Sequence, residues 1–115
     1  MEAPPYNSIP DQQITLESYA SCTYGNEALY ANGNLFITDL FYKLFKKIKI
    51  TSLTVQGYGN ISAKYLGKQG GSRIEFNLNT EYILNNYDYI SITSYRYTQA
   101  RGEYTQWSAI IIIYN

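Results

Sequence analysis

The chain of 115 residues contains no histidine, a single cysteine and only three prolines. Without imidazole there is no histidine base, no Ser-His or Cys-His nucleophile and no common zinc site. Because Cys22 is the only cysteine, no intrachain disulfide can form, and we expect its thiol to be a small core side chain. We therefore expect no enzyme: no catalytic residue, no metal site and no cofactor.

Charge is also scarce, with nine basic and nine acidic side chains and a formal net charge of zero. A neutral chain is a poor candidate for general nucleic-acid binding. The sequence has no apolar run long enough to cross a bilayer and no N-terminal signal segment. Neither a nucleic-acid partner nor membrane insertion is expected.

The few charges are segregated along the sequence. Before residue 40 the ionised side chains are all acidic, and from residue 43 to 73 they are all basic: Glu2, Asp11, Glu17, Glu27 and Asp39, then Lys43, Lys46, Lys47, Lys49, Lys64, Lys68 and Arg73. One interpretation is that the two segments lie side by side in the fold or across a symmetric interface. The other is a basic patch that binds an acidic ligand, such as a sialylated or sulfated glycan.

All three prolines, Pro4, Pro5 and Pro10, fall in the first ten residues. Proline cannot donate to a sheet ladder, so residues 1–13 are predicted to be an extended leader or a linker from something upstream. Residues 14–115 are then one domain, which is large enough for a single two-layer core.

Short segments of alternating or β-branched residues follow one another between glycine and asparagine turn signals. The expected strands include residues 14–18, 50–55, 61–66, 73–79, 89–98 and 105–114. In residues 73–79 the alternation predicts that Ile74, Phe76 and Leu78 point inward. Turns are predicted at Gly25-Asn26 and at Asn32-Gly33-Asn34, and residues 100–103 are predicted to link the last two strands as a hairpin. Seven or eight short strands predict an all-β fold, an antiparallel β-sandwich.

Residues 35–50 are ambiguous. Apolar side chains from Phe36 to Ile48 fall on one helical stripe, Thr38 is a candidate cap, and Asp39 would lie in the first turn. The surrounding strands argue for extended structure instead. A short helix near residues 38–48 and an irregular strand both remain open.

The last strand is the most apolar segment, since Ile110 to Ile113 place β-branched side chains on both faces. Such a strand needs cover on both sides, so we expect it to be central in a sheet or covered by another subunit.

The chain is rich in tyrosine, with fourteen in all. Tyrosine offers a large contact area with a polar tip, which suits it to recognition surfaces, although it is also a good strand residue. Around the predicted last hairpin, aromatic and guanidinium groups come together, a combination favoured in interface hot spots. The candidate contact residues for a receptor are Tyr95, Arg96, Tyr97, Arg101 and Tyr104, with packing as the alternative role.

These features together resemble the receptor-binding head at the tip of a trimeric viral fibre, and most closely a short adenovirus fibre head of the kind that reptilian viruses carry. Pro4 to Asp11 would be the end of the shaft, Ile14 to Ser18 the first strand and Trp107 to Tyr114 the last. Thr15-Leu16-Glu17-Ser18 stands where the mammalian viruses have Thr-Leu-Trp-Thr. Receptor-binding heads of phage tails match the same pattern.

The resemblance implies a homotrimer at the virion surface that follows an upstream fibre shaft and binds a host cell-surface receptor, either protein or glycan. The expected trimer contacts are Trp107, Ile111 and Ile113. The alternative function is a standalone carbohydrate-binding, lectin-like β-sandwich that stacks sugar rings on tyrosine and tryptophan.

Overall fold

A computed structural model describes residues 9–115, which fold into two antiparallel four-stranded sheets packed face to face. The all-β sandwich predicted from the sequence is confirmed. The strands are β1 (Gln12–Ser21), β2 (Glu27–Phe36), β3 (Lys47–Gly57), β4 (Asn60–Gly67), β5 (Arg73–Glu75), β6 (Tyr82–Ile83), β7 (Tyr89–Thr98) and β8 (Tyr104–Tyr114). A short helix α1 (Asp39–Leu44) and a 3₁₀ turn η1 (Leu84–Asn86) complete the fold.

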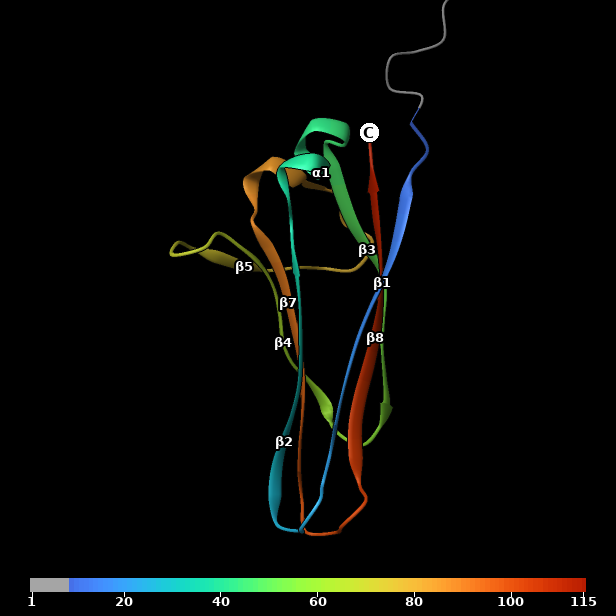
Figure 1. Cartoon of the computed structure of the whole chain (residues 1–115), viewed down its shortest axis with the longest axis vertical. Helices are drawn as coiled ribbons and strands as arrows, with labels where there is room; N and C mark the ends of the chain where they lie inside the picture. The colour runs from blue at the N-terminus through green and yellow to red at the C-terminus, as the bar shows by residue number, and fades with distance from the viewer. Residues whose placement is uncertain (1–8) are drawn as a thin grey trace, which may run out of the picture.

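One sheet has the strand order β1-β8-β3-β6 and the other β2-β7-β4-β5. The long strands run along the long axis of the molecule, and most connections cross from one sheet to the other (Figure 1). β7 and β8 therefore lie in different sheets, so the hairpin predicted at residues 100–103 is wrong. The loop residues turn the chain as expected, but they carry it across the sandwich.

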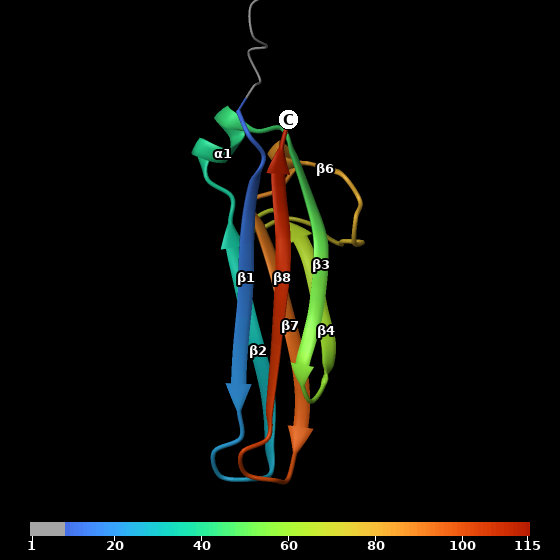
Figure 2. The same ribbon diagram turned by 90° about the vertical axis from the view of Figure 1, so that its right-hand side faces the viewer.

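The predicted leader overlaps the first strand. Residues 1–8 lie outside the described residues, and Gln12 and Gln13 already belong to β1. β1 begins at the same end of the sandwich as the end of β8, and the β1–β2 and β7–β8 loops lie together at the opposite end (Figure 2). We call that opposite end the tip.

β8 is the central long strand of its sheet, because it pairs with β1 on one side and β3 on the other. Its alternate residues Trp107, Ala109, Ile111 and Ile113 point between the sheets and are fully buried. Ile110 and Ile112 point to the outer face and are half-buried. The expectation that this strand is central in a sheet is confirmed.

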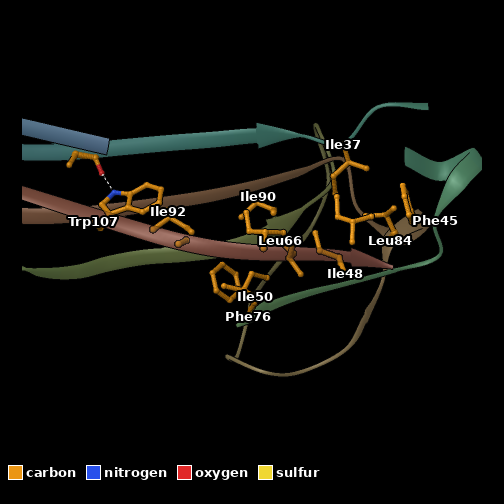
Figure 3. Close-up of a cluster of buried hydrophobic side chains, with 14 residues drawn as sticks. Ile37, Phe45, Ile48, Ile50, Leu66, Phe76, Leu84, Ile90, Ile92 and Trp107 are labelled. Atoms are coloured by element: carbon orange, nitrogen blue, oxygen red, sulfur yellow. Dashed lines mark hydrogen bonds between the residues drawn. The ribbon is translucent and has the colours of Figure 1, made fainter. Parts of the chain in front are cut away.

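Trp107 is the largest fully buried side chain and lies at one end of the core, where its indole nitrogen donates a hydrogen bond of 2.6 Å to the Ala31 carbonyl (Figure 3). A Cβ on Gly33 would lie 2.7 Å from Cζ2 of this indole, so only glycine leaves room for the ring. The turn predicted at Asn32-Gly33-Asn34 is wrong, since β2 runs straight through it. The glycine serves close packing there, whereas the predicted Gly25-Asn26 turn is present with positive φ at both residues.

The strand predicted over residues 73–79 ends at Glu75. Phe76 is buried as expected, whereas Ile74 and Leu78 are each 40% exposed. Ile74 is the cross-strand partner of the buried Leu66, so it shares the inward side but is only partly covered at the sheet edge, and the inward prediction is wrong for Leu78, which lies beyond the strand. The amide of Phe76 donates to the Lys64 carbonyl and that of Asn79 to the Ile50 carbonyl, which shows the chain crossing between sheets here. Alternation stops because the chain leaves the β4 edge after three residues.

α1 occupies only six residues of the predicted helical stripe. Phe36 at one end of the stripe belongs to β2 and is exposed, while Ile48 at the other belongs to β3 and is buried. The short helix is therefore the alternative that is confirmed. Thr38 takes the N-cap position with an extended backbone, but its side chain makes no capping hydrogen bond. Among residues 9–115, no helix is long and apolar enough to span a membrane.

Candidate recognition site on the outer face of the sandwich

The five predicted receptor-contact residues do not form one cluster, because β7 and β8 lie in different sheets. Tyr95 and Tyr97 point outward from the β2–β7 sheet, whereas Tyr104 points outward from the opposite sheet. Arg96 shares the inward-pointing side of β7 with the buried Ser94, and Arg101 lies in the tip loop. Tyr95 and Tyr97 share the outer face of β7, and Arg96 and Tyr97 line one hollow at the tip.

Arg96 holds the tip together. Its Nη2 lies 3.2 Å from Oε1 of Glu103, and its guanidinium lies 5.3 Å from the ring centre of Tyr58. The same Glu103 oxygen accepts a 2.7 Å hydrogen bond from the Thr98 hydroxyl. The Thr98 hydrogen bond and the Arg96 guanidinium together lower the pKa of Glu103 below its ordinary value. This arrangement connects β7, the β7–β8 loop and the β3–β4 turn, which is a structural role.

Arg101 also joins tip segments, since its Nε donates to the Thr23 carbonyl at 3.2 Å. Beside it, the amide of Cys22 donates to the Glu103 carbonyl at 2.8 Å, and the amide of Gly102 donates to the Cys22 carbonyl at 2.9 Å. Cys22 is buried, as expected, and its sulfur accepts the Gly25 amide at 3.2 Å. The two tip loops are therefore one hydrogen-bonded unit.

The strongest candidate for recognition is a set of three outward rings near the tip, Tyr30, Tyr95 and Tyr97, which we call the tyrosine face. They are 62%, 37% and 50% exposed. Tyr30 and Tyr95 are cross-strand partners on β2 and β7, and their ring centres lie 5.1 Å apart. Sequence reasoning missed Tyr30, since only the β2–β7 register places it beside Tyr95.

Polar residues continue the tyrosine face along the same two strands. In the next outward pair, the Thr93 hydroxyl donates a 2.9 Å hydrogen bond to Oδ1 of Asn32. The pair after that is Asn34 and Ser91. None of the outward residues of β2 and β7 is charged: Ala28, Tyr30, Asn32, Asn34 and Phe36, and Tyr89, Ser91, Thr93, Tyr95 and Tyr97.

A second aromatic cluster lies on the other sheet at the tip. Tyr104 contacts Tyr19 with ring centres 5.5 Å apart, and Tyr58 meets it edge-on at 6.4 Å. A Cβ on Gly57 would lie 2.4 Å from the Tyr104 ring, so glycine admits this ring to the surface beside the β3–β4 turn. Tyr104 is thus packed between strands as well as partly exposed.

Trp107, Ile111 and Ile113, the residues expected at a trimer interface, have no exposed surface in one copy. Contact between copies along β8 would fall instead to the residues between them. Ile110 and Ile112 form that outer stripe, flanked by Thr15 on β1 and Lys49 on β3. Because successive side chains of a strand point to opposite faces, the residues available for contact between copies are the neighbours of the predicted ones.

In the described residues 9–115, the two oppositely charged segments form no ion pair with one another. β1 and β3 lie on either side of β8, and the two ion pairs among residues 9–115 join Lys47 to Glu81 and Arg96 to Glu103. Neither of these carboxylates comes from the acidic first segment. Glu17 and Lys49 instead lie on the same outer face, on opposite sides of the isoleucine stripe.

The flank between the β3 and β4 edges contains a hollow of about 280 Å³, with Leu53, Ile61 and Leu78 on its apolar side and Lys64 and Glu75 on its polar side. A shallower hollow of about 340 Å³ lies at the tip beside Arg96 and Glu103. Across the described part of the chain, no three histidine, cysteine, aspartate or glutamate side chains are grouped as metal ligands would be.

No protein-family model, curated protein or solved structure matches this chain.

Proposed function

We propose that this chain is a non-catalytic attachment module, the receptor-binding head of a homotrimeric viral fibre, and that the tyrosine face contacts a receptor on the host cell surface. The observation that supports this most is the exposure of Tyr30, Tyr95 and Tyr97 on a rigid, uncharged sheet face. Large rings held by a ladder of backbone hydrogen bonds bind with little loss of conformational entropy.

The position of this face fits the proposal. β1 begins at the end of the sandwich farthest from the tip loops (Figure 2). A fibre shaft ahead of β1 would hold that end, so the tip would be farthest from the virion. Tyr97 and Tyr30 lie one and three residues from the tip ends of β7 and β2, within reach of a cell surface.

The outer face of the other sheet supports assembly of copies. Ile110 and Ile112 form an apolar stripe on β8, and uncompensated apolar surface of this kind is typical of subunit contacts. Copies packed through this stripe would turn their tyrosine faces outward. Three receptor sites on one rigid trimer would then convert weak single-site binding into firm attachment.

Oligomeric state tests this proposal directly. We expect mass photometry and analytical ultracentrifugation to give three copies per particle, and the double variant Ile110→Glu/Ile112→Glu to give single copies with the same far-ultraviolet circular dichroism. The control is Phe36→Glu, which places one glutamate on an exposed apolar residue of the opposite face. A wild-type protein that stays monomeric at micromolar concentration would overturn the fibre assignment.

The alternative is a standalone carbohydrate-binding module. The amide of Asn32 and the hydroxyl of Thr93 beside the tyrosine rings favour it, because polar groups next to aromatic surfaces are typical of sugar sites. Trp107 takes no part in such a platform, since it is fully buried. A monomer that binds sugars through Tyr95 would select this alternative.

A further inference from the structure

The outer surface of β2 and β7, which includes the tyrosine face, is uncharged over five consecutive outward residue pairs. The neighbouring strand β4 continues this character, because Asn60 is paired with Tyr95 and Ala63 with Thr93. The cation on this sheet face is Arg73 at the β5 edge, and its guanidinium already lies 4.2 Å from the ring centre of Tyr65. A carboxylate or sulfate on the ligand would lose its water here without gaining a cation.

The rings present apolar faces with polar rims. A pyranose ring has the matching form, with C–H groups on one face and hydroxyls around its edge. Tyr30 and Tyr95 are tilted by 52° to one another, which leaves two ring surfaces of different orientation on adjacent strands. Tyr97 follows on the same side of β7, about 7 Å further along the strand.

Polar groups suited to hydroxyls lie beside the rings. Because Oδ1 of Asn32 accepts the Thr93 hydroxyl hydrogen, the orientation of the amide is fixed and its NH₂ group is directed elsewhere. The Thr93 oxygen still has acceptor capacity. Asn60 adds a second exposed amide on the β4 side of Tyr95. Amides and hydroxyls pair with sugar hydroxyls without requiring charge on either partner.

We propose that the ligand of the tyrosine face is a neutral glycan chain of hexose or N-acetylhexosamine units that lies along β7. The glycan is bound along its length rather than by one end, because the tyrosine face is an open surface and not a pocket. One ring stacks on Tyr95, and its hydroxyls bond to the Asn32 amide and the Thr93 hydroxyl. This inference rests on the proposed attachment function and adds the chemical class of the receptor.

The first arm of the test uses labelled wild-type protein on a panel of animal and bacterial cells. We expect Tyr30→Ala and Tyr95→Ala each to weaken binding about tenfold or more, as the loss of a central aromatic contact does. The matched control is Tyr24→Ala, which removes a tyrosine that is 85% exposed on a tip loop. Wild-type protein that binds no cell of the panel overturns the attachment function itself.

The second arm separates ligand classes. Periodate oxidation of the cells at acidic pH, under conditions that cleave the ring diols of neutral sugars, should abolish binding, whereas sialidase should leave it intact. An array of neutral oligosaccharides and their sialylated and sulfated counterparts should bind wild-type protein only through neutral chains, and Tyr95→Ala and Asn32→Ala should reduce this signal. Tyrosine-dependent binding that survives periodate and is lost with protease means a protein receptor: attachment stands and the glycan inference falls. A dependence on sialic acid or sulfate also overturns the inference.

Discussion

At the scale of single residues, the fold depends on the contact between Trp107 and Gly33. The indole fills the space between the sheets at the level where β2 passes, and its N–H satisfies the Ala31 carbonyl of that strand. An Asn-Gly pair usually indicates a turn because glycine accepts positive φ. Here glycine is required for its missing side chain, a reason that depends on a tryptophan 74 residues further along the sequence.

Gly33→Ala tests this contact. A methyl group there would lie 2.7 Å from the indole, so the ring or the strand must shift, and we expect a loss of about 1–3 kcal/mol in the free energy of unfolding. Urea titration followed by tryptophan fluorescence measures it. Gly71→Ala is the control, since its nearest neighbour would lie 3.4 Å away, and unequal losses are expected; equal losses would show that the indole contact is unimportant.

At the scale of elements, the alternating side chains of β8 have two different roles. Its inward residues are the core of one copy, and its outward residues are the proposed contact between copies. Ile111 and Ile112 are adjacent in sequence and chemically identical, but one meets the opposite sheet and the other meets the outside. The same substitution at each position should therefore change different properties.

Ile111→Ala is expected to lower the unfolding free energy by about 2–5 kcal/mol, because it leaves a cavity in a fully buried core. Ile112→Ala should cost less unfolding free energy in single copies and should weaken the assembly instead. Urea titration at low protein concentration and mass photometry across a concentration series measure the two effects. Equal effects on folding would contradict the assigned faces.

Several elements could be predicted from local pattern, and others could not. The apolar, β-branched Ile110 to Ile113 predicted a central strand, and the alternation around Phe76 predicted that this residue is buried. Which sheet a strand joins is not a local property: residues 100–103 turn the chain, but nothing in them says that β7 and β8 part. That choice alone separates Tyr104 from Tyr95 and brings Tyr30 to Tyr95.

At the scale of the whole molecule, each end of the sandwich is held by a carboxylate that accepts a hydroxyl hydrogen bond and pairs with a cation. At the tip, Glu103 joins Thr98 and Arg96. At the other end, the Tyr114 hydroxyl donates a 2.8 Å hydrogen bond to Glu81, which also lies 3.6 Å from Lys47. Lys49 adds a cation 5.5 Å from the Tyr114 ring centre. Both carboxylates have a lowered pKa, with the hydroxyl hydrogen bond as the largest cause. The end at Tyr114 depends in addition on a phenol that stays neutral.

The tip should weaken in acid. The folded-state pKa of Glu103 is lowered, so its contribution to stability is present above the ordinary carboxyl value of 4.5 and is lost as pH falls through the folded value. We expect Glu103→Gln to lower stability at pH 7 and to lose this difference from wild type in strong acid. Thermal unfolding across pH 2 to 7 would show a constant difference if the carboxylate charge were irrelevant.

The opposite end should weaken in base. Burial and the hydrogen bond to Glu81 raise the pKa of Tyr114 to about 12, whereas the unfolded chain ionises this phenol near 10.0. The folded state therefore loses stability as pH rises from about 10 to about 12, because only the unfolded state readily releases the proton. Tyr114→Phe, which has no proton to release, should remove part of this alkaline loss, and Glu103→Gln should leave it unchanged. Urea titrations at pH 8, 10 and 11.5 measure both variants. If the alkaline slope of Tyr114→Phe matched that of wild type, the end of β8 would not be anchored through this hydroxyl.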